Sequence, residues 1–156
     1  MQNPMNAFLK CLTSAGLLAI VVSGCGGSGD ALKVPPLQPV SGTIMLDGKP
    51  LPGASVTFLP VGDTKGQVSS GNTDDSGKFT VNYVNGQPGV PEGEYKVLVS
   101  KLVQRDGKPL EPGMSAAMVG AIDMIPTKYK NPDDLVNRIA VTSGGKKDLV
   151  FELKSK

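Results

Sequence analysis

The stretch Val40–Phe58, VSGTIMLDGKPLPGASVTF, carries the pattern that decides the fold. A central Asp47-Gly48 pair separates two runs in which apolar residues share one parity, Val40, Ile44 and Leu46 in the first and Ala54, Val56 and Phe58 in the second. A period of two with one polar face is typical of strands with one buried face in an antiparallel sheet. Asp-Gly favours a two-residue type I′ hairpin turn, because both central residues need a positive φ. The stretch therefore predicts strands joined by a tight turn.

The same alternation recurs along the rest of the chain. Further runs of this kind lie at residues 79–83, 95–99, 138–142 and 148–154. Turn-forming residues precede the first of these runs at Asp74–Gly77 and separate the last two at Ser143–Gly145. Several short strands with frequent turns predict an all-β fold, a single antiparallel β-sandwich of about seven strands. A domain of this size buries roughly 65% of its unfolded surface, enough to fold without disulfides.

Composition limits the classes of function. The chain has 156 residues, 20 of them glycine and 13 proline, with a formal net charge of +2. Acidic and basic residues are interspersed, so no basic stripe indicates nucleic-acid binding. Histidine is absent, which removes the commonest general base and metal ligand. Cys11 and Cys25 are the two cysteines.

The N-terminal residues resemble a bacterial lipoprotein signal. The uncharged run Cys11–Val22 has 12 residues, whereas a permanent transmembrane helix takes about 20. Val22-Ser23-Gly24-Cys25 resembles a lipobox, an aliphatic residue and two small residues before a cysteine. The resemblance implies cleavage between Gly24 and Cys25 and acylation of Cys25. The alternatives are a plain signal peptide with a chance cysteine and an uncleaved anchor.

These features divide the chain into three parts. Residues 1–24 are the predicted signal peptide, residues 25–39 a lipidated cysteine followed by a Gly/Ser/Pro tether, and residues 40–156 the sandwich. An irregular insertion is expected at about 104–126. The protein is thus expected to be exported and held to a membrane by its lipid. Gly26, in place of aspartate after the cysteine, resembles lipoproteins on the periplasmic face of the outer membrane or on the cell surface.

Three motifs give a more specific resemblance. They are DGKPLPGASVTF at 47–58, TDDSGKF at 73–79 and GEYKV at 93–97. Together they resemble the carboxypeptidase regulatory-like, transthyretin-like (prealbumin-like) β-sandwich over residues 40–103. The residues from Ile125 to Pro132 resemble an element of small planctomycete-type lipoproteins of this class. The resemblance implies the fold and says almost nothing about activity, because one fold hosts many functions.

The insertion is the best candidate for an interaction site. Residues 114–125 are mostly apolar and contain Met114, Met118 and Met124. This segment is predicted to be a short helix or an irregular loop. It either covers the open end of the sandwich or presents an adaptable contact surface for a partner or the membrane. Tyr129 is the one aromatic candidate for sugar stacking, with a role in the core or at its rim as the alternative.

No catalytic constellation is recognisable. Nucleophilic catalysis needs a base beside the nucleophile, and the transthyretin-like hydrolases rely on histidines that this chain lacks. The pairs Asp74-Asp75 and Asp133-Asp134 each supply too few oxygens for Ca²⁺ and are predicted to act in turns and caps. We therefore expect no enzyme activity, no cofactor and no bound metal.

The expected function is a structural or protein-interaction role in the cell envelope. The expected partners are the membrane, through Cys25, and an envelope protein, with neither nucleic acid nor a small-molecule ligand. A carbohydrate- or Ca²⁺-binding module on the cell surface is the alternative, and a hydrolase is the remote one.

Overall fold

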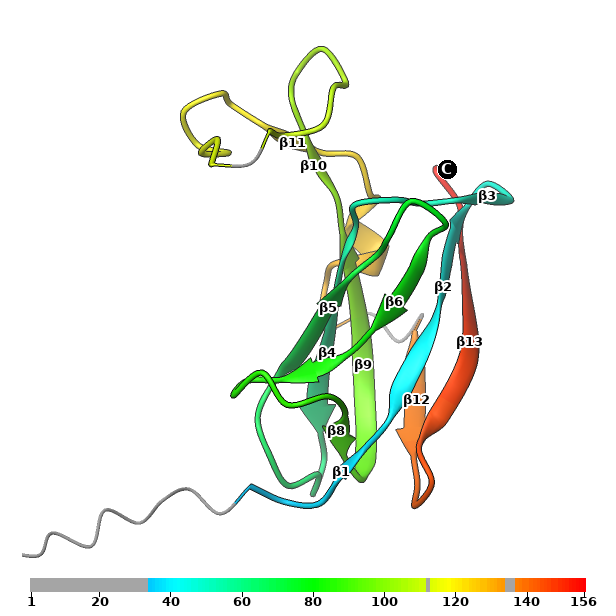
Figure 1. Ribbon diagram of the computed structural model, residues 1–156. Helices are drawn as coiled ribbons and strands as arrows, with labels where there is room; N and C mark the ends of the chain where they lie inside the picture. Colours follow the sequence, from blue (N-terminus) through cyan, green and yellow to red (C-terminus); the bar gives the residue numbers. More distant parts are fainter. Residues whose placement is uncertain (1–33, 112, 134–136) are drawn as a thin grey trace, which may run out of the picture. The chain divides into compact units, whose positions relative to one another are not determined.

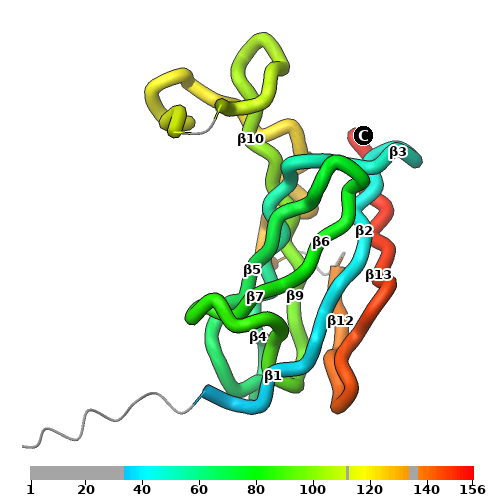
Figure 2. The backbone as a smooth tube through the Cα atoms, viewed as in Figure 1, coloured from blue at the N-terminus to red at the C-terminus, as the bar shows by residue number. Residues whose placement is uncertain are grey.

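The computed structural model describes residues 34–111, 113–133 and 137–156, which belong to one compact unit that begins at Lys33. Most of this unit is built from β-strands (Figures 1 and 2). The predicted signal peptide, the lipobox with Gly24 and Cys25, and the tether as far as residue 33 lie outside the described residues.

Two sheets form the body of the domain. The larger has the order β12-β9-β4-β5-β7, all antiparallel: β12 (Arg138–Val141), β9 (Gly93–Ser100), β4 (Ser55–Val61), β5 (Ser69–Asn72) and β7 (Asn82–Tyr83). The other contains β13 (Lys146–Leu153), β2 (Val40–Leu46) and β3 (Lys49–Pro50), with β6 (Lys78–Thr80) also paired to β2. The predicted all-β sandwich is confirmed. One pair is parallel, β13 with β2, and most of the domain separates these two strands as the crossover that parallel pairing needs.

Shorter elements complete the domain at its ends. β1 (Leu37–Gln38) pairs with β8 (Val90–Pro91), and β10 (Leu102–Val103) pairs with β11 (Ile122–Asp123). A single turn of 3-10 helix, η1 (Thr127–Tyr129), follows β11. The domain therefore begins by Leu37, three residues earlier than the expected start at Val40, because β1 is hydrogen-bonded into it.

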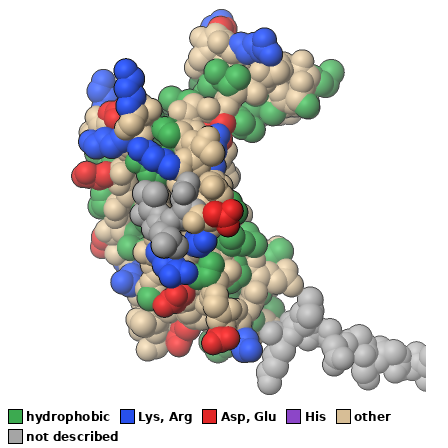
Figure 3. Space-filling model, turned by 180° about the vertical axis from the view of Figure 1, so that it is seen from behind, with side chains coloured by type: hydrophobic (Ala, Val, Ile, Leu, Met, Phe, Trp, Pro, Cys, Tyr) green, Lys and Arg blue, Asp and Glu red, His purple; other side chains and the backbone are tan. Residues whose placement is uncertain are grey.

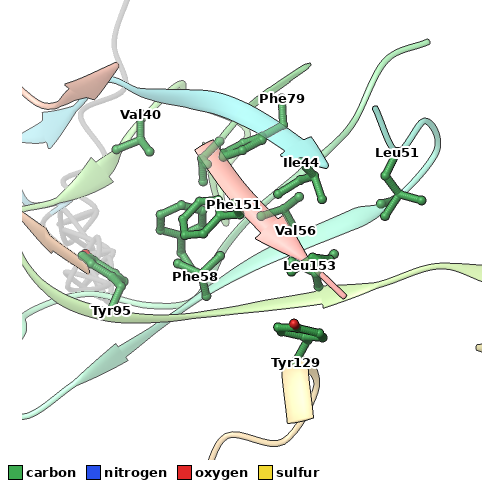
Figure 4. Close-up of a cluster of buried hydrophobic side chains, with 14 of the residues drawn as sticks. Val40, Ile44, Leu51, Val56, Phe58, Phe79, Tyr95, Tyr129, Phe151 and Leu153 are labelled. Carbon is green, nitrogen blue, oxygen red and sulfur yellow. The ribbon is translucent and has the colours of Figure 1, made fainter. Parts of the chain in front are cut away.

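The apolar parity of the strands becomes the core. Phe58 of β4 is fully buried, with its ring centroid 6.2 Å from that of Phe79 and 6.0 Å from that of Tyr95. Phe79 in turn lies 6.2 Å from Phe151 of β13 (Figure 4). Tilted rings at these separations are a favourable arrangement of aromatic pairs. The aromatic cluster thus joins both sheets.

The predicted turns adopt the expected geometry. Asp47 and Gly48 have φ values of 50° and 79°, so both central residues of the β2–β3 hairpin have the positive φ of a type I′ turn. In the next predicted turn, Asp74 Oδ1 accepts hydrogen bonds from the backbone N–H groups of Ser76 and Lys78 at 2.8 and 2.9 Å. Asp74 therefore acts as a turn residue, as expected.

The strand expected at residues 79–83 is divided between the two sheets. Its first part is β6, which pairs with β2, and its second part is β7, which pairs with β5. Val81 lies between them and donates its backbone N–H to Val40 O. The alternation of buried residues continues through the switch. Phe79 and Val81 belong to the main core, whereas Tyr83 is buried outside that cluster and its hydroxyl accepts a hydrogen bond from Gln67 N at 3.0 Å.

Candidate functional site

The insertion forms an arm, defined here as residues 102–124, that leaves the end of β9 and returns through β11 (Figure 1). It begins two residues before the expected boundary, and its described residues between β10 and β11 form turns, which is the irregular-loop alternative of the two that the sequence left open. Gly107 N–H donates to Gln104 O in the first turn, and Met118 N–H donates to Ser115 O in the second. Arg105 Nε donates to Gly120 O at 3.3 Å and links the two turns. The arm therefore has a defined conformation of its own.

Asp123 fixes the base of the arm. Its Oδ2 accepts a hydrogen bond from Ser100 Oγ at 2.7 Å and lies 3.3 Å from Lys130 Nζ. Its Oδ1 accepts from the backbone N–H groups of Lys101 and Ile125 at 3.1 and 2.9 Å. One half-buried carboxylate thus ties the end of β9, the return strand and the segment after it together.

The protonation of Asp123 is coupled to this attachment. Burial raises the pKa of its carboxyl, but the hydrogen bonds from Ile125, Ser100 and Lys101 and the charge of Lys130 outweigh burial and hold the pKa below 3.8. A lowered pKa in the folded state means that folding favours the charged form. The resulting stabilisation is complete above pH 3.8 and is lost as the pH falls through the lowered value.

We expect Asp123→Asn to loosen the base of the arm. The substitution removes the charge opposite Lys130 and replaces one acceptor oxygen with a donor, so hydrogen bonds to a charged group are lost. Hydrogen exchange at the backbone amides of Lys101 and Ile125 should become roughly 10-fold faster at neutral pH. Wild-type protein taken below the lowered pKa of Asp123 should show the same loss of protection at these amides, once the slower intrinsic exchange at acid pH is divided out.

Asp106→Asn is the matched control, because Asp106 pairs with Lys108 on the exposed part of the arm. Exposed pairs contribute little, so exchange at the base should not change. Equal exchange in both variants would show that Asp123 does not hold the arm.

Apolar side chains of the arm are exposed to solvent. Met118 is 88% exposed, Ile122 51% and Met124 41%. Figure 3 shows hydrophobic side chains gathered on the arm at the upper right. Met114 is half-buried. Of the two alternatives for the methionines, covering the end of the sandwich does not hold for Met118, which lies in a turn and is almost fully exposed.

Tyr129 does not belong to this surface. It lies on η1 with 5% of its surface exposed and packs in the core, and its hydroxyl accepts a hydrogen bond from Lys154 N at 2.9 Å. A ring buried in this way is not available for sugar stacking. The alternative role in the core is the one that the structure shows.

A groove runs along the base of the arm, with a volume of about 460 Å³. One wall comes from the end of the sandwich and the other from the arm, and the apolar lining residues are Pro52, Leu102, Pro109 and Leu110. Polar lining residues include Ser55 and Asn72. These residues are far apart in the sequence, so sequence reasoning missed the groove.

Two further hollows are each lined by several charged residues. One, of about 310 Å³, lies over β2 and β6 and includes Asp74, Lys78 and Asp148. The other, of about 490 Å³, includes Asp63, Glu92 and Glu94, near the start of β9. Among the described residues that line them, no Ser or Thr hydroxyl donates a hydrogen bond to a carboxylate or amine side chain, and Thr64 Oγ1 donates to the backbone oxygen of Glu94.

The described ranges contain no group of three or more Cys, Asp or Glu residues placed to hold a metal ion. Asp133 belongs to a turn in which its backbone N–H donates to Asn131 Oδ1, and Asp134 lies outside the described residues. No helix in the described part of the chain is long and apolar enough to span a membrane.

Comparison with known proteins identifies no relative. No family model, no curated protein and no solved structure matches this chain. The resemblance to the carboxypeptidase regulatory-like sandwich therefore stays a prediction from the motifs.

Proposed function

We propose that this chain is a lipid-anchored protein of the cell envelope that displays a non-catalytic β-sandwich and contacts a protein partner through its arm. The lipobox residues Val22–Cys25 support the anchor, and export is implied by the apolar run before them. The observation that carries the proposed contact is the row of exposed apolar side chains on an arm that is fixed at its base.

The position of the arm fits this role. Leu37 of β1 pairs with Pro91, just before β9 begins, whereas the arm follows the end of β9 at Ser100. A strand of eight residues spans about 26 Å at roughly 3.3 Å per residue. The chain thus enters at one end of the sandwich and the arm leaves at the other (Figure 2). The arm is therefore at the end of the sandwich opposite to Leu37.

Exposing the arm's apolar side chains to water is unfavourable, and a bound partner would remove them from water. Met118 is 88% exposed and Ile122 51% exposed, and exposed apolar clusters commonly mark interaction sites. Methionine is unbranched and polarisable, so it adapts to different partner surfaces. An arm with internal hydrogen bonds presents these side chains with little further ordering on binding.

Photo-crosslinking in intact cells tests the contact. A photoreactive amino acid at Met118 should give a discrete protein adduct, because this side chain is the most exposed apolar one on the arm. Val150 on β13 is the matched control, since it is apolar and 62% exposed but lies on the sandwich. An adduct from Met118 that is absent from Val150 supports the proposal. The same pattern from both positions, or no adduct from either, would contradict it.

A further inference from the structure

We infer that the groove at the base of the arm binds an extended, largely apolar segment of a partner polypeptide. The inference deepens the proposed function by naming the chemistry of the contact. It rests on the proposal that the arm contacts a protein and does not depend on the lipid at Cys25.

The size and lining of the groove suit such a segment. Its volume of about 460 Å³ lies within the range of roughly 300–1,000 Å³ found for specific ligand sites. Leu102 is 44% exposed on one side, with Pro109 and Leu110 beside it, and Pro52 faces them from the sandwich. A few apolar side chains from a partner would be desolvated between these walls.

Both walls are held in place before any partner binds. On the arm, Pro109 forms a β-bridge with Val103, and its carbonyl oxygen accepts a hydrogen bond from Gln104 Nε2 at 3.0 Å. On the sandwich, the buried Thr73 Oγ1 donates to Leu51 O at 2.6 Å and accepts from Ala54 N at 2.8 Å, which fixes the Pro52-Gly53 turn. A preformed groove reduces the ordering cost of binding.

The polar groups of the groove favour a polypeptide over a lipid surface. The described structure gives the side chains of Ser55 and Asn72 no hydrogen bond within the domain, so they are free to pair with peptide N–H and C=O groups. Asp75 and Lys101 add one charge of each sign at the rim. This pairing suits a segment that carries both charges and gives no net attraction to an anionic membrane or to nucleic acid.

A peptide selection tests the inference. A phage-displayed library of random linear 12-residue peptides is selected on the full chain, and the best peptide is synthesised and measured by fluorescence anisotropy. We expect selected sequences with two or more apolar residues. Leu102→Ser and, separately, Leu110→Ser should each weaken binding of that peptide by about 10-fold, because each removes a desolvated contact in the groove.

Val150→Ser is the matched control, since it removes an exposed apolar side chain on the sandwich, outside both the groove and the arm, and should leave the affinity unchanged. Leu102 is partly exposed, so its variant should unfold at the wild-type temperature. Asn72→Ala removes an exposed amide of the groove and should also weaken binding of the peptide. It tests the groove without changing either leucine. The inference would be overturned if all three groove variants bound the peptide with wild-type affinity, or if the selection yielded no binding peptide.

The outcome separates this inference from the proposed function. Cys25→Ser should bind the peptide with wild-type affinity, because the groove lies in the folded domain. A Met118 adduct in cells without peptide binding in the groove would leave the contact through the arm standing and reject the groove. Peptide binding without such an adduct would support the groove and reject the wider role of the arm.

Discussion

Phe58→Ala is expected to lower the free energy of unfolding by about 3–5 kcal/mol. Phe58 is fully buried and packs against both Phe79 and Tyr95, so truncation removes a large apolar side chain and leaves a cavity where the two sheets meet. Domains are commonly stable by only about 5–15 kcal/mol, so the loss is a large part of the total. Urea denaturation followed by circular dichroism measures it.

Two further variants make this result specific. Phe58→Leu keeps most of the volume and should be less destabilising than Phe58→Ala. Val84→Ala removes apolar atoms from a side chain that is 61% exposed, and its effect should stay within about 0.5 kcal/mol. Should Phe58→Ala unfold at the same urea concentration as Val84→Ala, Phe58 is not at the centre of the core.

The alternation of apolar and polar residues correctly predicted those strands whose apolar side chains are buried against the core. Tyr95, Val97 and Val99 of β9 are buried because the strand is central in its sheet and one face meets the core. The Asp47-Gly48 hairpin was predictable for the same local reason, since the turn type depends on the φ preferences of two adjacent residues.

The elements that sequence reasoning missed depend on distant residues. β5, with the sequence SSGN, has no apolar alternation, and its place in the sheet comes from pairing with β4 and β7. The switch at Val81 follows from contacts with Val40, about a third of the domain away in the sequence. A pattern of period two specifies a face of a sheet but not which sheet the strand joins.

The candidate site also has a part that the sequence predicted and a part that needed the structure. The arm was predicted as a break in the alternation, but its anchor was not, although Asp123 stands out as one acid within an apolar run. The groove needed the structure, because Pro52 and Leu102 come together only after β4 and β9 pair in register. Local sequence thus locates the candidate segment, and the pairing of strands creates the groove beside it.

Cys25→Ser is expected to abolish lipid attachment completely. The thiol of Cys25 is the nucleophile that accepts the diacylglycerol in the lipobox resemblance, and a serine hydroxyl does not replace it. Each buried CH₂ of an acyl chain contributes about 0.8 kcal/mol to anchoring, and two or three chains hold a protein far more firmly than one. Cells fed radiolabelled palmitate should therefore label the wild-type protein and leave Cys25→Ser unlabelled, with the variant accumulating as the uncleaved chain.

The second cysteine provides the matched control. Cys11 lies in the apolar run before the predicted cleavage site, so Cys11→Ser should be labelled like wild type and give an identical mature protein. Mass spectrometry should find Cys25 as the first residue of both, carrying acyl groups. Label retained in Cys25→Ser, or an intact Met1 on the wild-type protein, would remove the anchor. The groove would then act in a protein held elsewhere, because its walls are built entirely from the folded domain.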